Sequence, residues 1–149
     1  MKNIYHQPDY NEIVDRIKML ASTNHRLWGQ MNLPQMLTHC TAQLRLALGE
    51  LASAPQGSFM MRTAIGKWIA FSAIPWPKDS NTPHEMNVTK GSLATTDVES
   101  GKMELLRYLN KVAGATQLSP HPFFGILSRD EWGRLIYKHI DHHLKQFSQ

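Results

Sequence analysis

The C-terminal segment, SRDEWGRLIYKHIDHHLKQF from Ser128 to Phe147, constrains the fold more than any other stretch of the chain. When it is placed on a helix at 100° per residue, its large apolar positions fall within one arc of about 80°. These positions are Trp132, Ile136, Ile140 and Phe147. A helix with one apolar face buries that face against neighbouring elements. The segment therefore predicts an amphipathic helix that packs into a helical core.

Histidines share this face of the predicted helix. His143 lies in the middle of the apolar arc and His139 at its edge, about 40° away, whereas His142 points about 100° from the centre and is expected in solvent. Residues four apart stand about 6 Å apart along the axis, so both inward imidazoles can reach a single metal ion. The pair is therefore either part of a metal site or two core histidines, each with a satisfied hydrogen bond.

Composition limits the class of protein. The 149 residues fit one domain, and the single cysteine excludes a disulfide framework and is consistent with a reducing compartment. The N-terminal stretch has no apolar core and no 18 apolar residues run together, so we expect a soluble, cytoplasmic protein with no membrane partner. The 16 basic residues are scattered, which predicts a solvated surface and no nucleic-acid partner despite the net charge of +4.

Two helices are predicted in the first third of the chain. The first begins near Asp9, which is placed to cap it, and runs to about Ser22. The second has Asn32 as its N-cap, Pro34 in its first turn and Gly49 at its end. Both carry apolar residues at helical spacing, so each is expected to bury one face.

The second helix carries a further candidate ligand. His39 lies on the flank of the buried face, about 60° from Met36, where it can reach a neighbouring helix. It is either a metal ligand or a boundary histidine bonded to a carbonyl group. Cys40 points deeper into the core and is expected to act as a small apolar residue.

The middle of the chain does not form one simple pattern. Residues 59–74, FMMRTAIGKWIAFSAI, are expected to be helical in part, and residues 75–92 are expected to form an extended loop containing three prolines. Trp76, Pro77 and His84 in this loop either line a substrate pocket or pin the loop to the rest of the protein.

The last two helices have clear start signals. Thr96 followed by Glu99 predicts a capping box for a helix that ends at Gly114. Ser128 and Glu131 form a second capping box at the start of the C-terminal helix. Four amphipathic helices with a long crossover between the second and third predict an all-α four-helix bundle. Bundles of this kind build metal sites in their core from side chains on facing helices.

Two motifs carry a resemblance to a known family. The stretch LPQMLTHC in the second helix and KHIDHHLKQF near the end of the chain resemble the DinB/YfiT-like superfamily, whose members pair a helix-two histidine with an HxxxHxxQ-type signature. In this chain that signature is His139, His143 and Gln146. The chain is also similar, over most of its length, to an uncharacterised bacterial branch of the superfamily. This similarity includes the stretches WGQMNLPQMLTHC and HPFFGILSRDEWGRLIYKHIDHHLKQF.

The resemblance implies a four-helix bundle that holds a divalent metal ion, Zn, Ni or Fe, through His39, His139 and His143. Some members of the superfamily are transferases or isomerases that depend on bacillithiol, mycothiol or glutathione, so the resemblance also implies a transferase that uses a low-molecular-weight thiol on a small-molecule substrate. Three imidazoles leave a position open for water or substrate, so a metal-dependent hydrolase is an alternative. A metal-stabilised binding or regulatory bundle is another, and a homodimer is left open.

The sequence assigns no general base. Asp141 is expected to face away from the histidine pair, at about 180° on the helical wheel. Gln146, about 60° from His143, is either a group that orients a ligand or bound water, or a surface amide.

Overall fold

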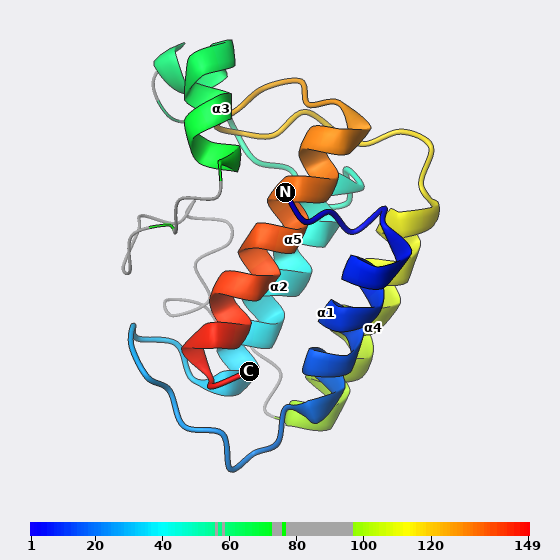
Figure 1. The fold of residues 1–149 in the computed structure, drawn as a ribbon, viewed down its shortest axis with the longest axis vertical. Helices are drawn as coiled ribbons and strands as arrows, with labels where there is room; N and C mark the ends of the chain where they lie inside the picture. The colour runs from blue at the N-terminus through cyan, green and yellow to red at the C-terminus, as the bar shows by residue number, and fades with distance from the viewer. Residues whose placement is uncertain (56, 58, 73–75, 77–96) are drawn as a thin grey trace.

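The protein is an all-α helical bundle, as the sequence predicts (Figure 1). The computed structural model describes residues 1–55, 57, 59–72, 76 and 97–149. Its helices in chain order are α1 (Gln7–Met19), α2 (Leu33–Ala47), the short 3-10 helix η1 (Phe59–Arg62), α3 (Ala64–Phe71), α4 (Val98–Gly114) and α5 (Arg129–Gln146). Within the described residues, β pairing is limited to a single bridge between His121 and Gly125.

Four long helices close into a ring around one core. α4 packs between α1 and α2, and α5 packs between the same two helices on the other side, while α3 lies outside this ring against α5 (Figure 1). The largest buried side chain, Trp132, lies near the start of α5, and its indole donates to the Ser119 carbonyl at 3.1 Å. In the described part of the chain no helix is both long and apolar enough to cross a membrane.

Capping residues begin the two helices that carry the candidate ligands. The Asn32 side chain accepts from the backbone N–H of Gln35, and the Gln35 side chain accepts from the backbone N–H of Asn32. These two bonds form a capping box at the start of α2. Ser128 and Glu131 do the same at α5, as predicted. Such reciprocal bonds satisfy backbone N–H groups that lack a partner inside the helix. Both helices therefore begin where the sequence predicts.

The other two long helices begin at different residues from those predicted. α1 begins at Gln7, because Pro8 fits the first turn of a helix, and the carboxylate of Asp9 accepts from the backbone of Asn3 instead of capping α1. α4 is capped by Asp97, which accepts from the backbone N–H of Ser100 at 2.8 Å, so the predicted box from Thr96 to Glu99 is wrong.

Of the predicted helix ends, that of the first helix is wrong, whereas those at Gly49 and Gly114 are confirmed. α1 ends at Met19 and not at Ser22, because the backbone of Leu20 adopts an extended conformation. Gly49 follows α2 with φ of +75°, a left-handed conformation that favours glycine, as expected for a helix end. The stretch 59–74 is helical in part, as expected, since η1 and α3 are separated by Thr63, the cap of α3.

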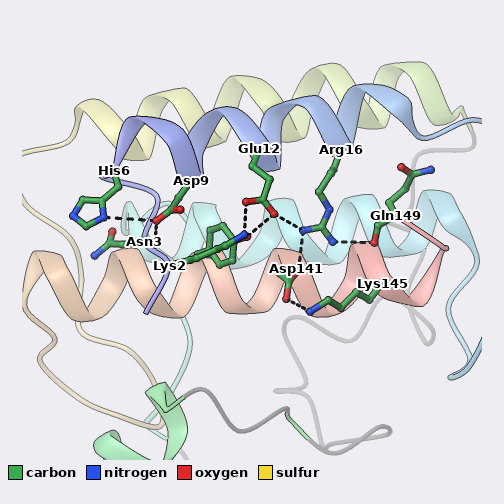
Figure 2. Close-up of polar contacts among 10 residues, drawn as sticks. Lys2, Asn3, His6, Asp9, Glu12, Arg16, Asp141, Lys145 and Gln149 are labelled. Carbon is green, nitrogen blue, oxygen red and sulfur yellow. Dashed lines mark hydrogen bonds and ion pairs between the residues drawn. The ribbon is translucent and has the colours of Figure 1, made fainter.

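An ionic contact ties α1 to the outer face of α5 (Figure 2). Arg16 on α1 donates to the carboxylate of Asp141 at 2.7 Å and to the carbonyl of Gln149 at 2.9 Å. One turn earlier on α1, the Glu12 carboxylate accepts from the Tyr137 hydroxyl at 3.0 Å. Asp141 therefore faces α1, which fixes the rotation of α5 about its axis and turns the opposite face inward.

His121, a buried histidine between α4 and α5, makes the fold sensitive to acid. The Nδ1 atom of His121 accepts from the backbone N–H groups of Phe123 and Phe124, and its ring packs against Trp132. Burial lowers the pKa of His121 from 6.5 to about 4. Between these two values the unfolded chain binds the proton more tightly, so the free energy of unfolding falls as the pH falls.

We expect His121→Asn to remove this part of the acid sensitivity. Asparagine keeps an acceptor for the turn but does not titrate. With a folded pKa of about 4 against 6.5, the histidine lowers the free energy of unfolding by about 2 kcal/mol between pH 7.5 and pH 5. Urea unfolding in the presence of a chelator would measure both proteins at both pH values. From pH 7.5 to pH 5 the unaltered protein should lose about 2 kcal/mol more of its free energy of unfolding than His121→Asn does. Parallel losses in both proteins would contradict the assignment.

Candidate metal centre

Two helices bring three histidines to one point in the core. His139 and His143 come from adjacent turns of α5, and His39 faces them from α2. All three side chains are buried. The ring centroid of His39 lies 4.8 Å from that of His139 and 4.7 Å from that of His143, and the latter two are also 4.7 Å apart. The structure thus brings together the three residues that the resemblance implies.

The ligand atoms are close enough to share an ion. One nitrogen from each imidazole lies within 4.8 Å of the other two, and the Nε2 atoms of His39 and His139 are 2.9 Å apart. Two nitrogens bound to one tetrahedral zinc ion at about 2.0–2.1 Å would be about 3.3 Å apart. Small side-chain adjustments therefore suffice to hold a metal ion at this position.

Burial keeps the imidazoles of His139 and His143 neutral. It is the main cause that lowers the pKa of His143 to about 3, and the neighbouring His39 lowers this pKa further, against a smaller opposite effect of Gln146. The pKa of His139 is held well below 6.5, first by burial and then by His143 and His39. A metal binds the unprotonated nitrogen, so a neutral histidine is the form that can act as a ligand.

Gln146 fixes the orientation of His143. Its amide nitrogen donates to the carbonyl of Trp28 at 2.6 Å, so its amide oxygen faces His143 Nδ1 at 3.1 Å. That oxygen can only accept, which assigns the proton of the neutral imidazole to Nδ1 and leaves Nε2 with its lone pair. Gln146 is therefore a buried partner of a candidate ligand and not a surface amide.

We expect Gln146→Leu to weaken metal binding about 10- to 100-fold, the usual range for losing a group that orients a histidine ligand. Gln146→Glu keeps an oxygen acceptor for His143 Nδ1 but loses the donor to the Trp28 carbonyl, so it should lose less affinity than Gln146→Leu. Competition titration with a zinc-sensitive dye would measure both variants. Equal affinities for Gln146→Leu and the unaltered protein would contradict the orienting role.

Aromatic side chains border the site on one side. Trp76 lies with its ring centroid 6.1 Å from that of His139 and 6.2 Å from that of His142. Trp28, from the connector between α1 and α2, meets His142 edge-on at 6.1 Å. His142 is therefore half-buried between two indoles, and the prediction that it lies in solvent is wrong. The predicted pocket residue Trp76 does lie beside the histidines, whereas Pro77 and His84 fall outside the described residues.

The donor set and its surroundings fit a divalent metal ion. His139 Nδ1 is buried and, within the described part of the chain, has no hydrogen-bond partner, which is costly in a site built only for packing. Neutral imidazoles suit Zn, Ni, Cu or Fe. Cys40 does not join them, since its thiol contacts the Met36 sulfur at 3.7 Å and burial raises its pKa.

Fold and site together define a class of protein, an all-helical bundle whose core holds three histidines able to bind a metal ion. The chain belongs to the family DUF1569, described as a protein of unknown function, whose profile matches residues 2–149. Searches of curated proteins and of solved structures found no match.

Proposed function

We propose that this protein is a divalent-metal-dependent enzyme of the DinB/YfiT-like type that transfers a low-molecular-weight thiol to a small electrophile. One observation carries the proposal: three buried imidazoles from α2 and α5, of which burial keeps the two on α5 neutral, have ligand atoms within 4.8 Å of one another. A set of three histidines leaves at least one coordination position for an outside molecule, which is typical of catalytic and not of structural zinc sites.

Charge favours an anion at the open position. Neutral imidazoles do not compensate a divalent cation, and the nearest carboxylate on α5, Asp141, is already paired with Arg16 on the far side of the helix. A bound metal lowers the pKa of a thiol or a water molecule and so favours the thiolate or hydroxide. The resemblance to thiol-dependent relatives favours the thiolate over the hydroxide of a hydrolase.

Residues of the chain would shape the reaction around the metal. His39, His139 and His143 would hold the ion, and Gln146 would keep the His143 ring in place. The indole of Trp76 offers an apolar surface beside His139 for the substrate. In the transfer the thiol sulfur forms a bond to the electrophilic carbon, the leaving group departs with its bonding electrons, and the thiol proton passes to solvent.

An activity screen that compares metal-loaded with chelator-treated protein would test this proposal. The zinc-, nickel- or iron-loaded protein would be mixed with glutathione, bacillithiol or mycothiol and with 1-chloro-2,4-dinitrobenzene, and thioether formation would be followed by absorbance. We expect a rate that chelation abolishes and that metal restores. A metal-loaded protein that accelerates none of these transfers, but hydrolyses a small ester, would overturn the thiol assignment in favour of the hydrolase.

A further inference from the structure

The outer side of α3 is apolar and exposed. Six large hydrophobic side chains on η1, α3 and the adjacent loop before α5 form what we term the α3 face: Phe59, Met60, Ile65, Trp68, Ile69 and Ile126. Each is between 54% and 84% exposed, whereas the other exposed large hydrophobics in the described residues are scattered over other elements. An apolar patch of this kind on one surface marks an interaction site.

The two sides of α3 differ sharply. Phe71 on the inner side is buried and packs edge-on against Phe124 at 5.2 Å. Ile65, Trp68 and Ile69 follow the spacing i, i+3, i+4 and so share one side of the helix, whose centre lies about 110° from Phe71. α3 therefore has one apolar side that the bundle covers and a second that the described residues leave open.

We propose that the α3 face is the contact between two copies of this chain in a symmetric homodimer. Large aromatic side chains carry about 150–250 Å² each, and if the four other side chains are taken as of similar size, the six offer roughly 800 Å² at these exposures. That equals the area, about 800 Å² per partner, that a stable protein interface of standard size buries. A two-fold contact uses the same patch on both partners, so an apolar face meets an apolar face.

Charge on and around this face favours a protein partner over a lipid surface. From Leu51 to Trp76 the chain has no acidic residue and only two basic ones, Arg62 and Lys67. Lys67 donates to the Ile126 carbonyl at 2.6 Å and lies 3.9 Å from Glu131, and Arg62 donates to the Pro122 carbonyl. Both cations are already engaged within the chain and are not set out to bind lipid phosphates, as a membrane-docking surface requires.

The dimer would also brace one wall of the histidine site. Lys138, next to His139 on α5, donates to the carbonyls of Ala70 and Ser72 at the end of α3, both at 2.8 Å. The Trp76 indole donates to the same Ala70 carbonyl at 3.0 Å. A partner that holds α3 thus holds the carbonyls on which Trp76 and Lys138 are anchored.

Sedimentation equilibrium of the metal-free protein over a range of concentrations would test this proposal. We expect the unaltered chain to dimerise, and Trp68→Glu to raise the dimer dissociation constant roughly a hundredfold, because a charge replaces a central aromatic anchor. Met103→Glu is the matched control, because Met103 lies on α4, outside the α3 face, and is 65% exposed against 70% for Trp68. It should leave the dissociation constant unchanged, and circular dichroism should be the same for all three proteins.

Two results would overturn the homodimer. One is an unaltered chain that stays monomeric at every concentration, in which case flotation with vesicles of phosphatidylcholine and phosphatidylglycerol would reveal a lipid-binding face. The other is a Trp68→Glu variant that dimerises as strongly as the unaltered chain, which would place the contact elsewhere. Neither result bears on the metal centre, whose test is separate.

Discussion

Replacing His143 with alanine is expected to weaken zinc binding about a hundred- to a thousandfold. If roughly 10–16 kcal/mol of zinc binding is shared among about four ligands, loss of one costs about 3–4 kcal/mol. His143 has the best-defined geometry of the three histidines, because Gln146 holds its Nδ1 and directs its Nε2 away from the amide. Elemental analysis of protein purified without an affinity histidine tag, followed by zinc competition titration, would measure the change.

His142→Ala provides the control for this experiment. His142 precedes His143 on α5 and its ring lies 5.2 Å from that of His143, yet it packs between Trp28 and Trp76 and does not belong to the ligand group. Its loss should change zinc affinity only slightly. If neither the unaltered protein nor His142→Ala carries metal after reconstitution, the metal centre and the activity proposed from it are both wrong.

Local signals predict α5 and the positions of its two candidate ligands. Ser128 and Glu131 lie three residues apart and determine the start of α5 by bonds within one turn. The register of His139 and His143 then follows from the helical period alone. For this reason the sequence could place two candidate ligands on one inward face without knowledge of the rest of the fold.

Features that depend on the path of a loop could not be predicted in the same way. A helical wheel gives the direction of His142 relative to α5, but not that Trp28 from one connector and Trp76 from another cover that direction. The sequence does not decide between the two roles of Gln146 for the same reason, because its decisive partner is the backbone carbonyl of Trp28. The position of His39 opposite α5 likewise rested on the resemblance, since the wheel put it only on a flank of α2.

Replacing His39 and His139 together with leucine is expected to stabilise the metal-free protein by about 1–3 kcal/mol. The two imidazoles are buried, and their Nε2 atoms contact each other. His139 Nδ1 adds a buried polar atom with no hydrogen-bond partner among the described residues. Replacing both histidines leaves neither of the two Nε2 atoms of this contact unpaired. Urea unfolding in the presence of a chelator would measure the gain.

His121→Leu is the matched control for the double variant. His121 is also buried, but its Nδ1 accepts from the backbone N–H groups of Phe123 and Phe124. Leucine at this position leaves those donors unpaired, so the variant should lose about 1–3 kcal/mol of stability. The free energy of unfolding should therefore rise in the double variant and fall in His121→Leu. Such opposite changes would distinguish histidines retained for a ligand from a histidine that stabilises a turn.

Zinc should reverse the order of stability between the unaltered protein and the leucine double variant. A ligand that binds only the folded state stabilises it by about 4 kcal/mol at a thousand times its dissociation constant, which exceeds the expected advantage of leucine. The double variant lacks two ligands and should gain little from zinc. If it instead unfolds more easily than the chelated unaltered protein, then His39 and His139 stabilise the core as a packed pair. The cost of burying them would then give no reason to infer a metal ion.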